Sequence, residues 1–236
     1  EEHTIVKREL DGEADGVIVE PYSSEVDVVL PTESAKPVVL VGTGIETDRL
    51  FTSVMTDHGK LGKSLADAVI QGKAVKVGIL SGNQSQLGMR QRLKSVKDKL
   101  EEAGIEISWI LSEKELDKKM RNVEYFAENP VDTVISLEND DTEKAVDIIL
   151  NHDSISWKLY GEGRSEKLIY YLDKGTIQEL AVPNEYYMGY QSIVLAAQNI
   201  RYYTDKTEQA EVEFYMVSKD NLYDEETSRI LFPAVR

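Results

Sequence analysis

Residues 76–100 read KVGILSGNQSQLGMRQRLKSVKDKL, and this stretch decides the fold of the chain. An apolar β-type run, residues 77–80, stops at Ser81-Gly82-Asn83, and a segment with helical period begins after Gly88. In a parallel α/β sheet, ligands bind beyond the carboxyl ends of the strands, where loops and helix N-termini meet. The loop of this strand, loop and helix unit is therefore the first place where we expect a binding site.

The same alternation of strand and helix runs through nearly the whole chain. Strand-like runs occur at residues 16–20, 38–41, 51–55, 105–111, 133–137, 157–160, 180–182 and 211–217, and helical runs at 60–71, 115–128, 142–151, 165–173 and 187–203. Repeated βα units predict an α/β protein with doubly wound parallel sheets covered by helices on both faces. Because the strands are too many for one small sheet, we expect two lobes joined by short hinges.

Composition and charge limit the classes of partner. The 236 residues include 27 Lys and Arg against 43 Asp and Glu, which gives a formal charge of −16. A chain without a basic stripe is not suited to binding nucleic acid or an anionic membrane surface. Cys is absent, so disulfides and thiolate metal sites are excluded. The N-terminal EEHTIVKREL lacks the basic and apolar regions of a signal peptide, and no apolar run is long enough for a membrane span.

Motifs for catalysis are weak. Residues 42–47 (GTGIET) follow a strand and begin like a dinucleotide fingerprint, but Thr47 replaces the third glycine and no helix signal opens there. The three histidines lie far apart without metal-ligand spacing. Paired carboxylates such as Glu101-Glu102 and Asp140-Asp141 fit solvated helix ends better than acid/base machinery. We therefore predict no enzyme activity, no catalytic residues, no metal site and no cofactor.

A series of short fragments occurs in a characteristic order along the chain. They are residues 37–41 (PVVLV), 56–58 (TDH), 78–82 (GILSG) with Arg92 after it, 130–135 (PVDTVI), 159–175 (LYGEGRSEKLIYYLDKG), 182–184 (VPN), 188–190 (MGY) and 219–222 (KDNL). In this order they resemble the type I periplasmic solute-binding proteins, above all the sugar-binding members and the related cores of lac-repressor-like regulators. The resemblance covers nearly the whole chain.

The resemblance implies two doubly wound lobes that close around a ligand, with three crossings between them. The first lobe would comprise residues 1–58 and 185–210, and the second lobe residues 59–184 and 211–236. Family members open with a strand, a helix and a second strand before the counterpart of residues 16–20, a segment of about 60 residues. The first lobe is therefore expected to be N-terminally incomplete in this chain.

The resemblance also implies a set of ligand-binding residues. Arg92 matches an arginine that reaches the ligand in sugar-binding relatives, and a guanidinium can hold two sugar oxygens at once. Since Arg90 and Arg92 cannot both point into the cleft, a surface position for Arg92 is the alternative. Asn83 and the neighbouring Gln84 offer amide donors and acceptors at the strand end, where simple turn chemistry is the alternative.

The remaining candidates depart from the family pattern. Thr43 falls where sugar-binding relatives place a polar or basic residue after an Asp, and Glu138 where they carry Asn or Asp. Glu162 and Arg164 flank the loop that presents a ligand-facing Asp in the relatives. Pro183 stands at a position that is often Gln in the relatives, and Asn184, the next residue, remains available to a ligand. Two further groups could have a structural role instead of contacting the ligand. Asp57 suits a hinge or a strand end, and the tyrosines of residues 186–190 suit either packing or stacking on a sugar ring.

These inferences together predict a noncatalytic solute-binding protein of an ABC-type importer. Its ligand would be a sugar or a sugar-like molecule, its partner a membrane permease, and its location extracytoplasmic, as a periplasmic protein or a cell-surface lipoprotein. The alternative is a ligand-sensing module of a signalling receptor or of a lac-repressor-like regulator, which would share the fold and the ligand.

Overall fold

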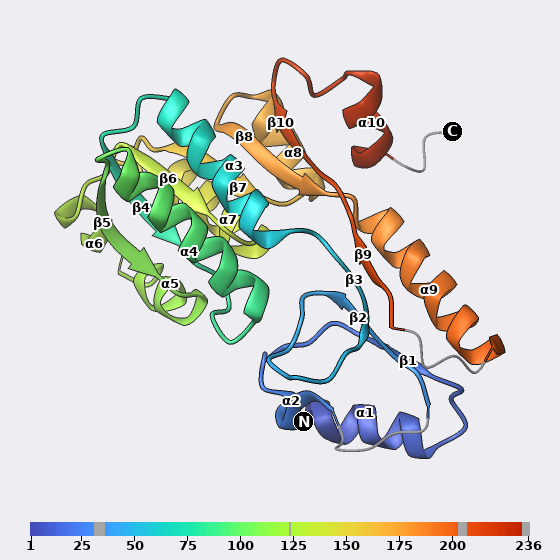
Figure 1. Cartoon of the computed structure of the whole chain (residues 1–236). Coiled ribbons are helices and arrows are strands. Elements are labelled where there is room, and N and C mark those ends of the chain that lie inside the picture. Colours follow the sequence, from blue (N-terminus) through green and yellow to red (C-terminus); the bar gives the residue numbers. More distant parts are fainter. Residues whose placement is uncertain (31–35, 123, 203–206, 233–236) are drawn as a thin grey trace. The chain divides into compact units, whose positions relative to one another are not determined.

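The computed structural model describes residues 1–30, 36–122, 124–202 and 207–232, and it divides into two compact units (Figure 1). The first unit comprises Glu1–Asp57, Ser85–Arg90 and Asn184–Glu213, and the second comprises His58–Gln84, Gln91–Pro183 and Phe214–Arg236. The short segment Ser85–Arg90, which the sequence placed in the second lobe, groups with the first unit. Each unit is built on its own sheet, which confirms the predicted α/β class with two parallel sheets.

The first unit is a parallel sheet with helices on both faces. Its strands are β1 (Val17–Val19), β2 (Val38–Gly42), β3 (Thr52–Met55) and β9 (Gln209–Glu211), hydrogen-bonded in the order β1-β2-β3-β9. Its helices are α1 (Glu2–Asp11), α2 (Val26–Val29) and α9 (Glu185–Tyr202). Neighbouring residues of β2 serve opposite faces, because side chains alternate along a strand: Val39 packs with Leu195 of α9, and Leu40 with Leu10 of α1.

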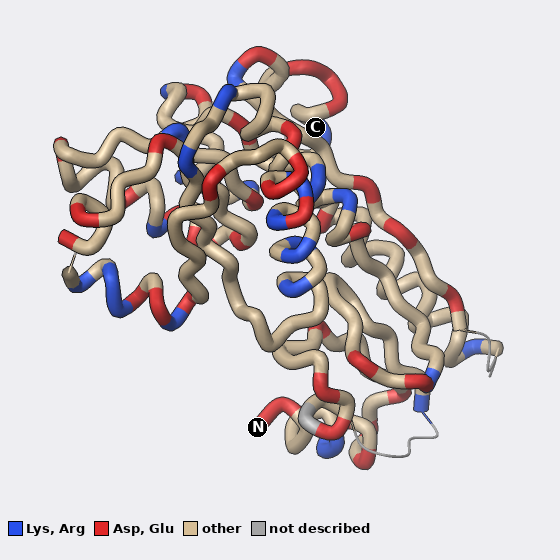
Figure 2. Tube along the Cα trace, turned by 60° about the vertical axis from the view of Figure 1, so that its left-hand side comes forward, with Lys and Arg blue, Asp and Glu red and all other residues tan. Residues whose placement is uncertain are grey.

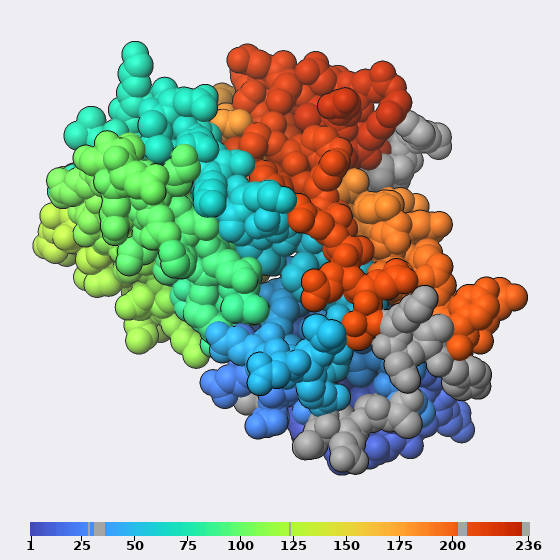
Figure 3. Space-filling view, viewed as in Figure 1, coloured from blue at the N-terminus to red at the C-terminus, as the bar shows by residue number. Residues whose placement is uncertain are grey.

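The second unit holds the larger sheet. Its strands are β4 (Lys76–Leu80), β5 (Glu106–Leu111), β6 (Thr133–Ser136), β7 (Lys158–Glu162), β8 (Ile177–Pro183) and β10 (Phe214–Ser218), in the order β10-β8-β7-β6-β4-β5. All neighbours are parallel except β10, which runs antiparallel to β8. Its helices are α3 (His58–Gln71), α4 (Leu87–Glu102), α5 (Glu113–Lys119), α6 (Glu124–Glu128), α7 (Asn139–Asn151), α8 (Glu166–Asp173) and α10 (Glu225–Leu231), and the first turn of α4, up to Arg90, groups with the first unit. Helices α3 and α4 form adjoining parts of the surface in Figure 3.

The core of the second unit contains three large aromatic side chains in mutual contact. The ring centroid of Phe126 lies 5.7 Å from that of Trp109 and 5.1 Å from that of Trp157, in tilted and edge-on arrangements. The indole nitrogen of Trp109 donates a hydrogen bond to the carbonyl of Asn129, 3.1 Å away. Burying these rings with the indole donor paired stabilises this end of the sheet.

Two elements differ from the sequence-based expectation. Residues 115–128, predicted as one helix, form α5 and α6, because a capping box at Ser112 and Glu115 starts α5 early and a turn at Asn122 interrupts the helix. Residues 211–217, predicted as one strand, divide between β9 and β10, whose backbones pair with β3 and β8 respectively. Periodicity does not reveal such a change of partner.

Other boundaries shift by a few residues. Strand β7 extends through Glu162, α7 begins at Asn139 rather than at Thr142, and Tyr203, the expected last residue of the long helix, lies outside the described residues. Within the part of the chain that the structure describes, no helix combines the length and apolar character needed to cross a bilayer.

Candidate functional site

The polar candidates of the second unit gather at the carboxyl ends of parallel strands. Leu80 of β4 is in register with Ser136 of β6, and Ser136 is in register with Gly161 of β7. The residues that follow these positions therefore meet at one edge of the sheet, and among them are Asn83, Glu138 and Glu162. The backbone N–H of Asn83 donates to Glu138 Oε2 at 3.2 Å, which ties two of the strand ends together.

Arg92 is buried on α4 and holds several groups of this edge. Its Nε donates to His58 Nδ1 at 3.0 Å and its Nη1 donates to the Leu137 carbonyl at 2.6 Å. Nη1 also lies 3.4 Å from Glu162 Oε2, and the side chains of Arg92 and Glu162 are 6% and 9% exposed. The pair is thus an almost fully desolvated ion pair, in which each charge depends on the other. Nη2 of Arg92 makes no hydrogen bond with the described residues.

A glycine sets the position of Arg92. At Gly62 of α3, an added Cβ would lie 2.5 Å from the backbone carbonyl oxygen of Arg92, closer than packed atoms approach. Helices α3 and α4 are therefore in backbone contact at this point. This contact brings the guanidinium of Arg92 next to His58, at the start of α3.

Glu138 has no cationic partner among the described residues, and acidic groups surround it. Burial raises the pKa of Glu138 to about 7, and the charges of Asp141, Glu113 and Glu162 act in the same direction. The Asn83 N–H opposes them by stabilising the carboxylate. Near neutral pH this side chain is thus present in both protonation states, so it can accept or donate a hydrogen bond.

Asp141 corrects an expectation from the sequence. The pair Asp140-Asp141 was expected on a solvated helix end, but the Asp141 side chain is fully buried and lies 3.3 Å from Lys144 Nζ. Burial raises the pKa of Asp141, and the Lys144 charge opposes that change. The reason is that α7 begins at Asn139, which places Asp141 in its first turn against the sheet edge rather than ahead of the helix.

The side chain of Arg164 contacts α10, the C-terminal helix. Its Nη1 donates to the carbonyl of Ile230 on α10 at 3.3 Å, and its backbone N–H donates to Asn139 Oδ1 at 3.2 Å. The preceding Gly163 has φ +138°, a conformation that side chains disfavour, and Ser165 caps α8. The loop after β7 is therefore built tightly, with the backbone of Arg164 close to the start of α7.

Thr43 and Asn184 lie in the first unit and serve its backbone. Thr43 is buried, and its hydroxyl accepts the N–H of Gly88 at 2.9 Å. Asn184 Oδ1 accepts the N–H of Tyr187 at 3.1 Å, which satisfies a free donor in the first turn of α9. Arg90 also belongs here, since its Nη2 binds Ser24 and Glu46 at 2.8 and 2.7 Å. Arg90 and Arg92 thus have separate sets of partners.

The site contains residues that the sequence reasoning missed. His58 was considered only as part of the TDH fragment and as a rejected metal ligand, yet it is buried and contacts Arg92. Glu113, which follows β5, contributes to the acidity around Glu138. Polar residues two or three positions after the ends of β4, β5 and β6 were the available signal. Among the described residues, no group of His, Asp or Glu side chains has the arrangement of a metal site.

Asp and Glu residues are spread over the elements of both units (Figure 2). The acidic character of the chain is thus general, while the strand-end edge of the second unit is distinguished by burial of its charges.

Comparisons with known proteins place the chain in a family. A family model described as a periplasmic binding protein domain matches residues 1–203. None of the curated proteins matches the sequence. Among similar solved structures is a carbohydrate transporter solute-binding protein of Agrobacterium radiobacter in complex with D-arabinose. It has 17% identity and a TM-score of 0.86, and the alignment covers 97% of this chain and 82% of that one.

Two further structures have the same architecture. The Caulobacter myo-inositol binding protein is 19% identical with a TM-score of 0.82, over 96% of this chain and 81% of that one. GanP, a glucose-galactose binding protein of Geobacillus stearothermophilus, is 20% identical with a TM-score of 0.77, over 93% and 82%. At these identities the similarity shows the fold, which is that of type I periplasmic binding proteins. Together with the family model it shows that the chain belongs to the periplasmic binding protein family.

Proposed function

We propose that this protein binds a sugar or sugar-like solute without chemical turnover and delivers it to the membrane permease of an ABC-type importer. The observation that supports this best is the set of polar strand-end residues in the second unit, Asn83, Glu138 and Glu162, with Arg92 paired to Glu162. Its location would be extracytoplasmic, which is typical of the family. Capture between two lobes stays a prediction of the resemblance.

The chemistry of the set suits a polyhydroxylated ligand. Sugar hydroxyls donate and accept hydrogen bonds, and carboxylates are strong acceptors for them. Glu138, with a pKa of about 7, supplies either an acceptor or a donor at neutral pH. Arg92 holds Glu162 in one orientation, so that little side-chain freedom would be lost on binding.

The predicted ligand-binding residues divide into two groups. We propose that Asn83, Glu138 and Glu162 contact the solute and that Arg92 reaches it through Nη2. Thr43, Arg164 and Asn184 remain ligand candidates on the strength of the resemblance. Their observed hydrogen bonds serve the backbone of their own loops and helix starts.

A ligand panel tests the proposal. The panel contains monosaccharides, disaccharides, polyols, nucleosides and furanoses, and we expect a subset of them to raise the melting temperature. At a hundredfold excess of ligand over Kd, binding adds about 2.7 kcal/mol to the free energy of unfolding. Calorimetry should give one site, and the recovered ligand should be chemically unchanged. Stabilisation by none of these compounds, or conversion of the bound one, would contradict the proposal.

A matched pair of variants locates the site. Glu138→Gln keeps the shape of the side chain but removes the carboxylate, and we expect affinity to fall about tenfold or more. Glu102→Gln, at an exposed position near the end of α4, should leave affinity unchanged. Equal affinities of the two variants would remove the strand-end set from the proposal while leaving solute binding itself intact.

A further inference from the structure

The strand-end edge of the second unit carries negative charge that its own cations do not balance. The charges of Glu113, Asp141 and Glu162 all act on Glu138. The side chains of Asp141 and Glu162 are 0% and 9% exposed, and each has a cation nearby. Glu138 and Glu113, which are half-buried, form no ion pair with the described residues. Because charges interact strongly where water is excluded, this edge has a negative potential.

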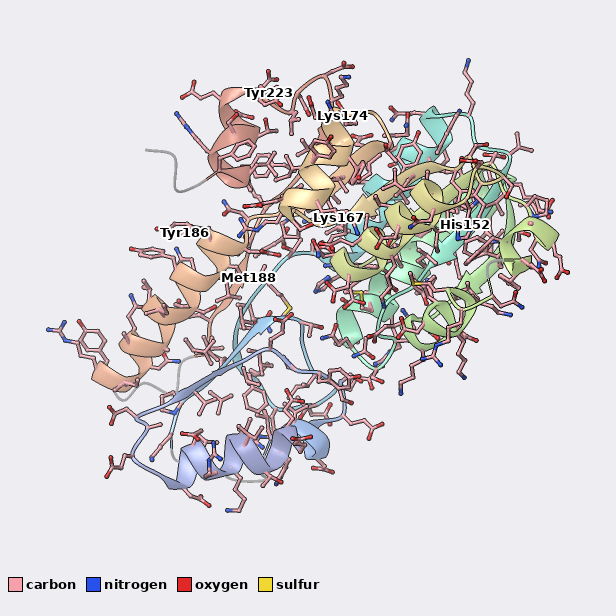
Figure 4. The ribbon with its side chains drawn as sticks, turned by 180° about the vertical axis from the view of Figure 1, so that it is seen from behind. His152, Lys167, Lys174, Tyr186, Met188 and Tyr223 are labelled. Carbon is pink, nitrogen blue, oxygen red and sulfur yellow. The ribbon has the colours of Figure 1, made fainter. Side chains whose placement is uncertain are left out.

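The lysines of the flanking helices are paired with other carboxylates. Lys144 of α7 lies 2.8 Å from Asp117 and 3.3 Å from Asp141. In Figure 4 Lys167 of α8 lies on the side of α7, where its Nζ is 2.8 Å from Asp147 Oδ1. The arginines of the edge have the partners described above. In the described part of the chain, these helices therefore supply no counter-charge for the two carboxylates that lack an ion pair.

One oxygen of Asp141 has no hydrogen-bond partner. Oδ1 lies 3.3 Å from Lys144 Nζ, whereas Oδ2 is buried and accepts no hydrogen bond from the described residues. Burial raises the pKa of Asp141 against the effects of Lys144 and of the Gly82 N–H. Buried acceptors of this kind are rare, because an unpaired one costs free energy. This oxygen is a second indication, independent of the balance of charges, that a positive group from outside the chain completes the edge.

The chemistry of the edge favours an organic cation over a metal ion. No group of acidic side chains among the described residues has the arrangement of a metal site. An ammonium group has a compact charge and three N–H donors, so it can meet several oxygens at once. We propose that the solute is an amino sugar and that its ammonium group binds the carboxylate of Glu138. This inference rests on the proposed function and narrows its class of ligand.

The protonation of Glu138 suits such a ligand. With a pKa of about 7, the side chain exchanges its proton near neutral pH, and an ammonium group at hydrogen-bond distance stabilises the carboxylate form. The charges of Asp141 and Glu113 attract the same ammonium group, whereas a neutral sugar gains nothing comparable from them. The amine should therefore bind more tightly than the sugar that has a hydroxyl in its place.

Matched sugars test the charge of the solute. Each set contains a hexosamine with its amine at C2, the parent hexose and the N-acetylhexosamine, in which a neutral amide replaces the amine. The sets have the gluco, galacto and manno configurations. Calorimetry near pH 7 should show, in at least one set, that the hexosamine binds about tenfold or more tightly than both other members. Absence of this preference from every set overturns the inference.

The same measurements separate this inference from the proposed function. If a neutral sugar binds and no hexosamine is preferred, the ammonium group is refuted and solute binding stands. If no solute of any kind binds, both are refuted.

Three variants test the place of the ammonium group. Glu138→Gln keeps the shape of the side chain without its charge, and the preference for the hexosamine over the hexose should fall to near parity. Glu113→Gln removes a more distant charge and should reduce the preference several-fold. Glu102→Gln, at an exposed position near the end of α4, should keep the preference in full. Circular dichroism should show that all three are folded, and an undiminished preference in Glu138→Gln overturns the assignment to Glu138.

Discussion

Glu138 shows how a single carboxylate makes the strand-end edge sensitive to pH. The side chain is largely buried, faces the carboxylates of Asp141, Glu113 and Glu162, and receives a hydrogen bond from Asn83. A buried carboxylate in such surroundings is stabilised when it binds a proton or when it accepts a hydrogen bond, for example from a hydroxyl group of a ligand. We therefore expect Glu138 to affect stability and, under the proposed function, the binding of the solute as well.

Substitution of Glu138 should change how stability depends on pH. The pKa of Glu138 is about 7 in the native state and 4.5 in the unfolded chain. Between these pH values the native state therefore binds more protons than the unfolded state. The free energy of unfolding then falls as pH rises through this window. Glu138→Gln abolishes that fall, and its melting temperature should match wild type near pH 4.5 and exceed it by about 2–4 °C at pH 8. A difference that does not vary with pH would contradict this.

Arg92 should matter for folding as well as for the ligand. Its removal takes away the guanidinium 3.4 Å from the Glu162 carboxylate, which is only 9% exposed, so we expect Arg92→Ala to lower the free energy of unfolding by about 3–5 kcal/mol in urea denaturation. Adding Glu162→Gln to Arg92→Ala should recover part of the loss, because the buried negative charge that Arg92 neutralised is also removed. Lys94→Ala, at an exposed pair with Asp98 on the same helix, is the control and should behave like wild type. A double variant less stable than Arg92→Ala would refute the pairing.

At the scale of elements, two helical glycines have opposite roles. Gly62 lets α3 touch the backbone of α4 at Arg92, whereas a Cβ added at Gly189 of α9 would meet nothing within 4 Å. Gly62 is needed for close packing of two helices, whereas Gly189 lowers the helical propensity of α9 without a close neighbour among the described residues.

The two glycines therefore form a matched test. Gly62→Ala should lower the melting temperature, since α4 must move by a few tenths of an ångström or more, with a cost of about 1–3 kcal/mol. Gly189→Ala should raise the stability by about 0.5–1 kcal/mol. Differential scanning calorimetry measures both. If both substitutions had the same sign, backbone contact between α3 and α4 would not be the reason that Gly62 is required.

At the scale of the whole molecule, the two units have separate cores. Leu40 packs with the α1 side of the first unit, while both tryptophans of the chain, Trp109 and Trp157, lie in the core of the second. Tryptophan fluorescence therefore reports on the second unit, whereas far-ultraviolet circular dichroism reports on both.

This division predicts unfolding transitions that do not coincide. Leu40→Ala removes a buried side chain, which costs about 2–5 kcal/mol in the first unit. We expect the circular dichroism transition in urea to broaden toward lower concentrations while the fluorescence midpoint stays within error of wild type. Coincident shifts by both probes would show instead that the two units unfold as one cooperative system.

Local patterns were sufficient for much of the fold. The alternation of strand and helix predicted the α/β class, and it located eight of the ten strands of the described residues, β1 to β8, and most of the longer helices to within a few residues. This works because the period of apolar residues reflects which face of an element is buried, and that depends on neighbours in the sequence. The polar loop after residues 77–80 likewise indicated Asn83, whereas Glu138 and Glu162 were candidates only through the family resemblance.

What the sequence by itself determined is thus the class of fold, the order of its elements and the edge at which polar residues collect. The tertiary structure decided which partner each segment takes: the division of residues 211–217 between two sheets, the inward direction of Arg92, the burial of Asp141 and the exposure of Tyr190. The physical reason is that burial and pairing depend on groups distant in the chain. Arg92 is held by residues 34, 45 and 70 positions away, and no local period carries that information.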